Sequence, residues 1–285
     1  MKLSFCYLSH RPGSIDLLAD SLSKQVKAGT DPDSLSIPDW ELIVIDGFPG
    51  RVQRGAANQY VSNLGIPVRH YGLPKVHTFP WARTGFANAH NTGMIYATGT
   101  HVVFLNDFCW FPGSTAYLWG RAFDLFPNHL ICGVGVTYNA KRPDVESKEG
   151  GEALSDVYTW RELDMRRDWT PREPWVPEVF DTGYWGGPIE YFERVNGMDE
   201  RSDFCASWGT ASVVAQARMH GMGLRVDRTL VTHMVDHREW ENGQEGLYRI
   251  KSEIADVPEE PIWTGWSCNP YLLREERRRQ MELMK

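Results

Sequence analysis

Short apolar runs that end in polar turns recur through the first 110 residues of this 285-residue chain. Leu3–Leu8, Trp40–Ile45 and His101–Leu105 have the length and apolar content of buried strands. Apolar residues follow helical spacing in Ser14–Lys27 and Thr84–Ala97. Strands that alternate with helices favour an α/β fold with a mostly parallel sheet, in which ligands bind beyond the carboxyl ends of the strands.

The residues that directly follow these strands are polar. They are Ser9, His10 and Arg11 after the first strand, Asp46 after the second, and Asn106 and Asp107 after the strand that begins at His101. A shorter strand is expected over Val68–Tyr71. Because the carboxyl ends of parallel strands meet at one edge of a sheet, we expect these polar side chains to line a single rim.

Composition narrows the classes of protein that fit. The formal net charge of -7 and the pI near 5.7 disfavour a broad binding surface for nucleic acid or anionic membrane. The five cysteines form no CxxC pair, and their odd number indicates reduced thiols. No run approaches the roughly 20 apolar residues that span a bilayer. We therefore expect a cytoplasmic protein, without a transmembrane segment, built as one compact unit.

The second half of the chain is less regular. Residues 139–177 are charged and rich in Trp, Arg, Glu and Pro without clear periodicity, which indicates a long excursion over the site, either a lid or acceptor loop or a solvated insertion. Order resumes over Gly183–Met198, followed by a helix over Ser207–Gly221 and a strand over Leu224–Val231. The tail from Tyr271 is helical in composition, and its arginines favour a solvated helix face, with a nucleic-acid or oligomer contact as the alternative.

Several segments occur in an order that is typical of one known family. They are Glu41–Asp46, Phe86–Gly99, His101–Phe108, Tyr184–Pro188 and Tyr191–Arg201. Over most of residues 3–237 the chain resembles the GT-A glycosyltransferases, especially the large inverting family that includes cellulose and chitin synthases. The resemblance implies a GT-A (Rossmann-like) α/β fold, with helices flanking the sheet, in a single catalytic domain with an acceptor-side insertion and a C-terminal helical tail.

In that family the turn after the first strand touches the nucleotide base, so the resemblance assigns this contact to Ser9, His10 and Arg11. The aspartate that ends the second strand accepts a hydrogen bond from the base, and Asp46 holds that position. A carboxylate binds an imide or amino N–H strongly because the hydrogen bond is charge-assisted. The turn is also explained by a helix N-cap at Ser14.

The resemblance also assigns contacts to the diphosphate and the sugar. His90 stands where the family usually has an arginine, and Asn91 matches the family's next position. Trp185, Gly186 and Gly187 belong to a glycine-rich strand that lies against the sugar.

A metal site is expected at the end of the strand that begins at His101. The family shows Asp-x-Asp there, whereas this chain has Asn106, Asp107 and Phe108. Asp107 and the Asn106 carbonyl offer two hard oxygen ligands, and His233 or His237 matches a late histidine ligand of metal-using relatives. Mn²⁺ or Mg²⁺ would offset charge on the leaving nucleoside diphosphate. The alternative is that both histidines make ordinary hydrogen bonds in a loop or the core.

The catalytic base is the least defined part. An inverting transfer needs a carboxylate that deprotonates the acceptor hydroxyl. The family's Glu-Asp pair falls on Gly209-Thr210 in this chain, so Asp203 is the first substitute, followed by Asp199 and Asp181. A surface loop role for these aspartates, a retaining mechanism, or a chain without turnover are the alternatives.

The sequence thus predicts a nucleotide-sugar-binding half over 1–115, an acceptor-binding and catalytic half over 116–240, and a C-terminal tail over 241–285. The predicted activity is hexosyl or related transfer from a UDP-type donor to a hydroxyl of a glycan, a small molecule or a modified DNA base. Three alternatives stay open: a phage-type glycosyltransferase acting on a hydroxylated DNA base, a nucleotide-sugar-binding protein without turnover, and a nucleotidyltransferase.

Overall fold

The computed structural model describes a little over half of the chain. The described residues are 1–9, 18, 21–22, 38–46, 68–72, 86–106, 109–111, 113–140, 158–163, 180, 183–200, 208–236 and 272–285. Most of the helix expected over Ser14–Lys27 lies outside these ranges.

The N-terminal half of the sheet is parallel. β1 (Lys2–Ser9) pairs with β2 (Asp39–Asp46) on one side and with β4 (His101–Asn106) on the other, and β2 pairs with β3 (Val68–Gly72). α4 (Phe86–Tyr96) precedes β4. The strand order β3-β2-β1-β4 confirms the α/β fold and the parallel pairing that the alternation of strands and helices predicts.

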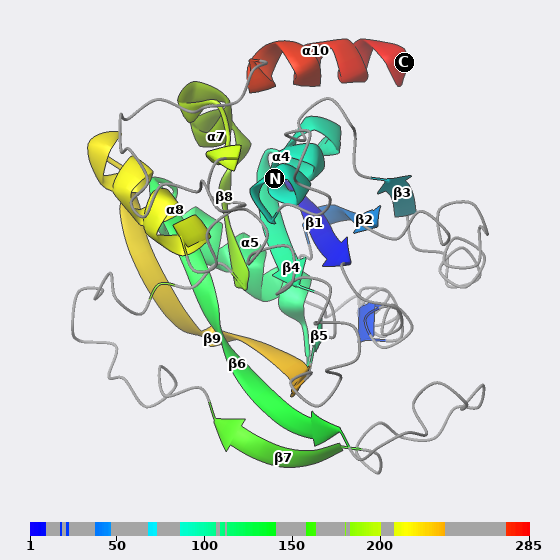
Figure 1. Ribbon diagram of the computed structural model, residues 1–285, viewed down its shortest axis with the longest axis vertical. Helices are drawn as coiled ribbons and strands as arrows, with labels where there is room; N and C mark the ends of the chain where they lie inside the picture. Colours follow the sequence, from blue (N-terminus) through cyan, green and yellow to red (C-terminus); the bar gives the residue numbers. More distant parts are fainter. Residues whose placement is uncertain are drawn as a thin grey trace, which may run out of the picture.

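The second half of the sheet is mixed. β8 (Tyr184–Pro188) lies antiparallel between β4 and β6 (His129–Ala140), and β9 (Gly223–Asp236) runs parallel to β6. β5 (Cys109–Trp110) pairs antiparallel with β9, and β7 (Tyr158–Leu163) with β6. The nine strands that the structure describes form one sheet (Figure 1). Pairing is therefore exclusively parallel only from β3 to β4, and β7 adds a strand within the region expected to be an irregular excursion.

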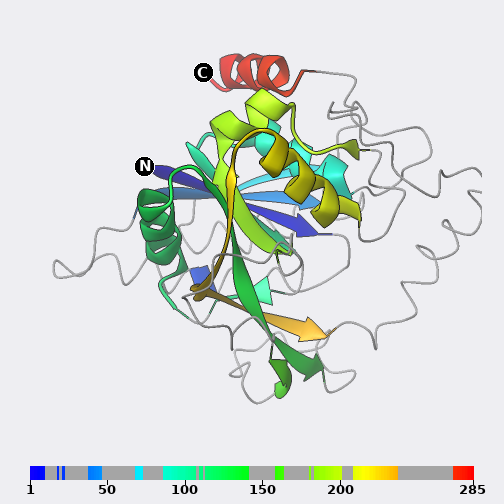
Figure 2. The same ribbon diagram turned by 90° about the vertical axis from the view of Figure 1, so that its left-hand side faces the viewer.

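Helices cover both faces of this sheet. α4, α7 (Ile189–Val195), α8 (Trp208–Met219) and α10 (Leu273–Leu283) contribute to one cluster of buried apolar residues. α5 (Thr115–Leu125) contributes to the other, on the opposite side of the sheet (Figure 2). Among the helices that the structure describes, none combines the length and the apolar character that crossing a bilayer requires.

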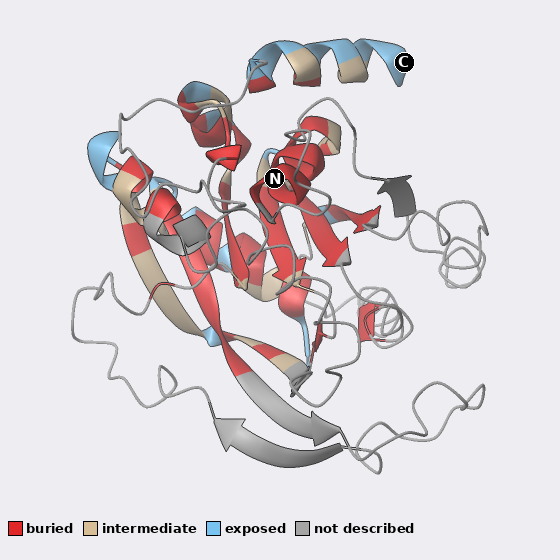
Figure 3. Cartoon of the chain, in the orientation of Figure 1, coloured by how far each residue is buried: buried red, intermediate tan, exposed pale blue. Residues whose placement is uncertain are grey.

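The alternation of side chains along β1 explains why both faces are covered. Leu3, Phe5 and Tyr7 belong to the cluster on the α5 face, whereas Cys6 and Leu8 belong to the cluster on the α4 face. Successive side chains of a strand point to opposite faces, so a strand that is apolar throughout needs a helix layer on each side. The central strands are accordingly buried along most of their length (Figure 3).

A buried carboxylate joins the amino ends of the first two strands to the loop after α4. Glu41 Oε1 accepts hydrogen bonds from Ser4 Oγ at 2.6 Å and from Thr98 N and Oγ1 at 2.8 Å. Gly99 N donates to Ser4 Oγ at 2.9 Å. The loop lies so close to β1 that a Cβ on Gly99 would stand 2.7 Å from both Lys2 O and Ser4 Oγ. Only glycine fits there without a shift of backbone.

We expect Gly99→Ala to lower the free energy of unfolding by about 2 kcal/mol, because the loop must move and the Glu41 hydrogen bonds stretch. Gly113→Ala is the matched control, since a Cβ at Gly113 would meet no atom within 4 Å. Urea denaturation of both variants measures the difference. An equal loss for the two would show that close packing at Gly99 is not the cause.

His101 makes stability depend on pH. Its ring stacks on Phe123 with centroids 4.5 Å apart. Burial lowers the pKa of His101 to about 4; nearby Asp124 opposes this shift, and the N-terminal ammonium adds to it. The folded state thus holds the neutral ring at a pH where the unfolded chain already binds a proton.

We therefore expect the free energy of unfolding to be steady above about pH 6.5 and to fall as the pH drops toward about 4. His101→Phe keeps the ring stack and should make this slope shallower. Burial also lowers the pKa of His129, so part of the slope remains. Urea denaturation between about pH 7 and about pH 4.5 measures it, and an unchanged slope in His101→Phe would contradict the assignment.

Candidate functional site

The carboxyl ends of three adjacent strands bring predicted binding residues together. Ser9 stands opposite Asp46 in the β1–β2 register, and Leu8 stands opposite Asn106 in the β1–β4 register. We call this edge of the sheet the rim. The backbone positions of Ser9, Asp46 and Asn106 therefore share one edge, as the sequence predicts. His10, Arg11 and Asp107 lie outside the described residues.

His233, one of the two predicted histidine ligands, lies beside β5, the strand that follows Asn106 in the chain. In the antiparallel pairing of β5 with β9, Cys109 stands opposite Met234 and Trp110 opposite His233. The rings of Trp110 and His233 meet edge to face with centroids 5.5 Å apart.

Strand directions place this contact at the same edge. β8 is antiparallel to both β4 and β6, and β9 is parallel to β6, so β4 and β9 run the same way. His233, near the carboxyl end of β9, thus lies toward the same edge of the sheet as Asn106, near the carboxyl end of β4. The sheet brings together two segments that are more than 120 residues apart in the chain.

Within the described ranges, no group of three or more His, Cys, Asp or Glu side chains is gathered as a metal ion would require. Of the residues predicted to bind metal, His233 is described and partly exposed, whereas Asp107 and His237 lie outside the described residues.

His90 and Trp185 are partners of each other in the core. Both side chains are fully buried, and Trp185 Nε1 donates to His90 Nε2 at 3.1 Å. The His90 ring also packs on Phe104, with centroids 4.4 Å apart. Because an indole N–H only donates, His90 Nε2 is the acceptor and carries no proton. The position that is usually arginine in the family that the chain resembles thus holds the neutral imidazole of His90 in the protein interior.

Gly186 and Gly187 lie in β8 where neighbouring strands and side chains approach closely. A Cβ on Gly186 would collide with Val102 O in β4, and one on Gly187 with Leu130 Cδ2 in β6. The glycine pair therefore has a packing role: it lets β8 fit between two strands.

Asn91 joins α4 to the turn that follows α7. Its Nδ2 donates to Met198 O and to Glu200 Oε1, each at 2.9 Å, and its Oδ1 accepts from Met198 N at 2.8 Å. Asn88 Nδ2 donates to the same Glu200 oxygen at 3.4 Å. The side chains of Asn88, Asn91 and Glu200 are fully buried. Asn91 thus fixes the backbone directly before the segment of the predicted base.

The turn itself is built by two residues with positive φ. Asn196 ends α7 at φ 62°, and Gly197 follows at φ 76° with its N–H bonded to Phe192 O at 2.8 Å. Asp199, one of the predicted bases, is buried in this turn. Asp203 and Asp181 lie outside the described residues.

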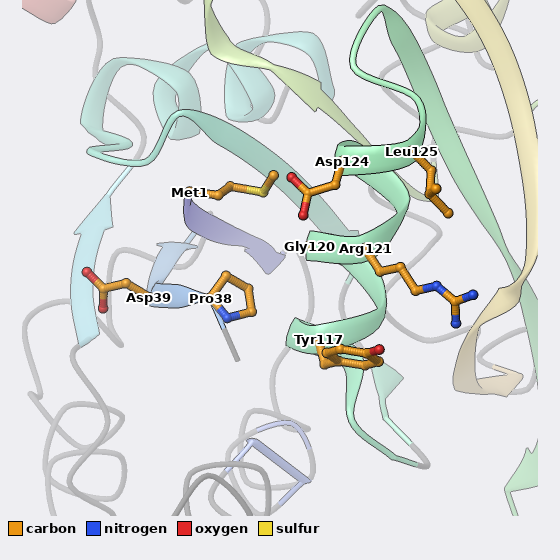
Figure 4. A pocket seen from close by; sticks show the side chains of 8 residues that line it. All are labelled: Met1, Pro38, Asp39, Tyr117, Gly120, Arg121, Asp124 and Leu125. Atoms are coloured by element: carbon orange, nitrogen blue, oxygen red, sulfur yellow. The ribbon is translucent and has the colours of Figure 1, made fainter. Parts of the chain in front are cut away.

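A groove on the opposite edge of the sheet is distinct from the rim. It has a cavity volume of about 600 Å³ and lies between the amino ends of β1 and β2 and helix α5 (Figure 4). Met1, Asp39 and Asp124 are among its lining residues. Its position at the amino ends of the strands separates it from Ser9, Asp46 and Asn106.

The burial of two ionisable side chains, Glu200 and Arg277, was not predicted from the sequence. Glu200 belongs to the Met-Asp-Glu segment of the family-like block, so its place in the sequence was a usable signal. Arg277 belongs to the arginine run that was predicted to form a solvated helix face. For Arg277 this prediction is wrong, because its side chain is 7% exposed, whereas Arg274, Arg278 and Arg279 are exposed. Arg277 differs from the neighbouring arginines only in the side of the helix on which it lies.

We expect Asn91→Ala to lower the free energy of unfolding by about 3 kcal/mol, because Met198 N–H, Met198 C=O and Glu200 each lose a partner in the interior. Thr92→Val is the matched control on the same helix. Thr92 is equally buried, but its hydroxyl bonds only Asn88 O one turn away, so its loss should be about 1 kcal/mol or less. Chemical denaturation measures both, and equal losses would contradict the link to the turn.

Comparison with known proteins gives similarity in structure but not in sequence. No protein-family model matches the chain, and no curated protein matches it in sequence. Residues 1–349 of S. aureus TarS, crystallised with UDP, match 91% of this chain and 67% of that one, with a TM-score of 0.53 and 12% identity. GalNAc-T7, crystallised with UDP, GalNAc and Mn²⁺, matches 82% of this chain with a TM-score of 0.55 and 14% identity.

The chain spans less than half of the matched chains of GalNAc-T7 and of the longer TarS structure, at 44% and 41%. At these identities the similarity establishes the fold. The chain has the GT-A fold, as the order of its family-like segments predicts.

Proposed function

We propose that this protein is a glycosyltransferase that moves a sugar from a UDP-type nucleotide sugar to an acceptor hydroxyl. The observation that carries the proposal is the rim, where Ser9, Asp46 and Asn106 end three adjacent strands and the His233 segment lies toward the same edge. Proteins of the same fold have been crystallised with UDP.

Asp46 is the proposed ligand of the nucleotide base. It ends β2 beside Ser9 at the end of β1, so the two residues can bind one planar group beyond the sheet edge. A carboxylate that accepts the uracil imide N–H makes a charge-assisted hydrogen bond, which favours UDP over a donor without such an N–H.

A divalent cation, Mn²⁺ or Mg²⁺, is proposed at Asp107, with the Asn106 carbonyl and His233 or His237 as further ligands. In the sequence Asp107 directly follows Asn106 and stands two positions before Cys109, which belongs to a strand paired with β9. Carboxylate, carbonyl and imidazole ligands suit Mn²⁺. When bound, the ion would offset the charge that develops on the leaving diphosphate.

The burial of His90 is a further reason to propose a cation beside the diphosphate. His90 accepts a hydrogen bond from Trp185 in the core and carries no positive charge toward a diphosphate. We therefore propose that a cation neutralises the diphosphate, with Arg11 or Arg83 as the cationic side chain that would do so without a metal.

Asp203 is proposed as the base, with Asp199 and Asp181 as alternatives. In the step, the acceptor oxygen forms a bond to the anomeric carbon while the bond from that carbon to the phosphate oxygen breaks. The electron pair leaves with UDP, and the hydroxyl proton passes to the Asp203 carboxylate. Asn91 fixes the turn at Met198 and Glu200, so the segment that carries Asp203 starts from a defined place.

A second candidate is a nucleotide-sugar-binding protein without turnover. It is favoured by the replacement of family acids with Asn106 and with Gly209-Thr210. Among the acceptors considered, a modified DNA base is disfavoured by the net charge of -7.

We expect UDP with Mn²⁺ to raise the melting temperature of the protein and Asp46→Asn to weaken UDP binding about tenfold, since it removes a charge-assisted hydrogen bond. Asp39→Asn is the matched control, because Asp39 lies at the other end of the same strand. Titration calorimetry with UDP measures both variants. Equal effects of the two, or no UDP binding by the unaltered protein, would contradict the proposal.

We expect Asp203→Asn to lower the hydrolysis of a UDP-sugar, measured as release of UDP, by about 100-fold or more, with UDP affinity unchanged. UDP binding without any release of UDP from UDP-sugars by the unaltered protein would instead identify the binding protein without turnover.

A further inference from the structure

We propose that the C-terminal helix α10 is a positioning element for the turn Asn196–Glu200, with Arg277 as the positioning residue. The structural part of this inference rests on contacts of described residues. Its effect on catalysis rests on the proposed function, because the turn leads into the segment of Asp203.

Arg277 ties α10 to two helices at once. Its Nε donates to Glu193 Oε1 of α7 at 2.7 Å, and its NH1 group donates to Ala97 O at 2.7 Å and to Met94 O. The two carbonyls belong to the C-terminal end of α4, where a helix carries partial negative charge. The guanidinium thus meets a carboxylate and a helix end of matching charge.

Because Arg277 is buried, its hydrogen bonds to α4 and α7 determine where α10 packs. Arg277 is 7% exposed, and a charge in that environment is stable only while its partners stay in place. The planar guanidinium directs several donors at fixed angles, so it also fixes the orientation of α10 on α4 and α7. The lysine ammonium lacks this geometry.

A second contact transmits the position of α10 to the turn. Leu273 N, at the start of α10, donates to Asn196 Oδ1 at 2.7 Å. The Leu273 side chain is 2% exposed and belongs to the same apolar cluster as Val195, which precedes the turn, and Met198, which lies within it. The first turn of α10 therefore packs on the end of α7 and bonds to it.

The turn is consequently held from two sides. Asn91 of α4 bonds Met198 and Glu200, and Leu273 of α10 bonds Asn196. Arg277 fastens α10 to the end of the same α4. Figure 1 shows α10 lying against α4 and α7. Loss of the α10 contacts would remove the hydrogen bond that holds the Asn196 side chain from the α10 side.

The sharpest test is Asn196→Gly. Glycine accepts the φ of 62° without strain, so the turn keeps its backbone while the oxygen that bonds Leu273 N is removed. Arg277→Met removes the charge but keeps most of the apolar stem, and Arg277→Lys tests the guanidinium geometry. Arg278→Met is the control, because Arg278 is an exposed neighbour on the same helix.

The experiment measures three quantities on the full chain, at a temperature at which each variant is folded. They are the Kd of UDP with Mn²⁺, kcat for UDP-sugar hydrolysis, and hydrogen exchange of the Gly197 and Met198 amides. We expect Asn196→Gly and Arg277→Met to keep the UDP Kd within about twofold, to lower kcat at least about tenfold, and to speed the exchange of both amides. Arg277→Lys should be intermediate and Arg278→Met unchanged.

Unchanged exchange in Asn196→Gly would overturn the positioning role, whatever the protein catalyses. Faster exchange with an unchanged kcat would overturn the effect on catalysis. Equal losses in UDP affinity and kcat would show a general structural role instead. If the unaltered protein neither binds UDP nor hydrolyses UDP-sugars, the proposed function fails, and the exchange rates alone decide whether α10 positions the turn.

Discussion

The insertion of β8 between β4 and β6 is the contact on which the rest of the structure depends. It joins the parallel strands that carry Ser9, Asp46 and Asn106 to β6 and, through β6, to β9, which carries His233. Because β8 is antiparallel to both neighbours, β4 and β6 point the same way. The carboxyl ends of the two halves therefore share one edge, as a site for a single ligand requires.

β8 also fastens both helix layers to the sheet. Tyr184 reaches the α5 face, where Trp119 Nε1 donates to its hydroxyl at 2.6 Å, and burial raises the pKa of Tyr184 well above its usual range. Trp185 reaches the other face and donates to His90. The two glycines that follow let the neighbouring strands close in. One five-residue strand thus makes buried hydrogen bonds on both faces of the sheet.

The sequence predicted what depends on local pattern, namely the strands at Lys2, Asp39, Val68 and His101 and their shared rim. It did not predict contacts that depend on distant partners. His90 stands where an arginine is usual, but nothing near it in the chain reveals that Trp185, 95 residues away, bonds it in the core. β7 carries mixed polar and aromatic residues and is defined as a strand by its pairing with β6. The run of arginines hides Arg277 because burial is decided by which side of the helix meets α4.

The distant contacts converge on α4. Glu41 binds the loop that follows this helix, Arg277 binds the carbonyls at its end, and Asn91 extends from its middle to the turn at Met198. Each of these groups is buried and would be costly to leave without its partner. These contacts connect the amino edge of the sheet, through α4, to the turn at Met198. The position of that turn, which precedes Asp203 in the sequence, is therefore set by buried contacts with α4 and α10.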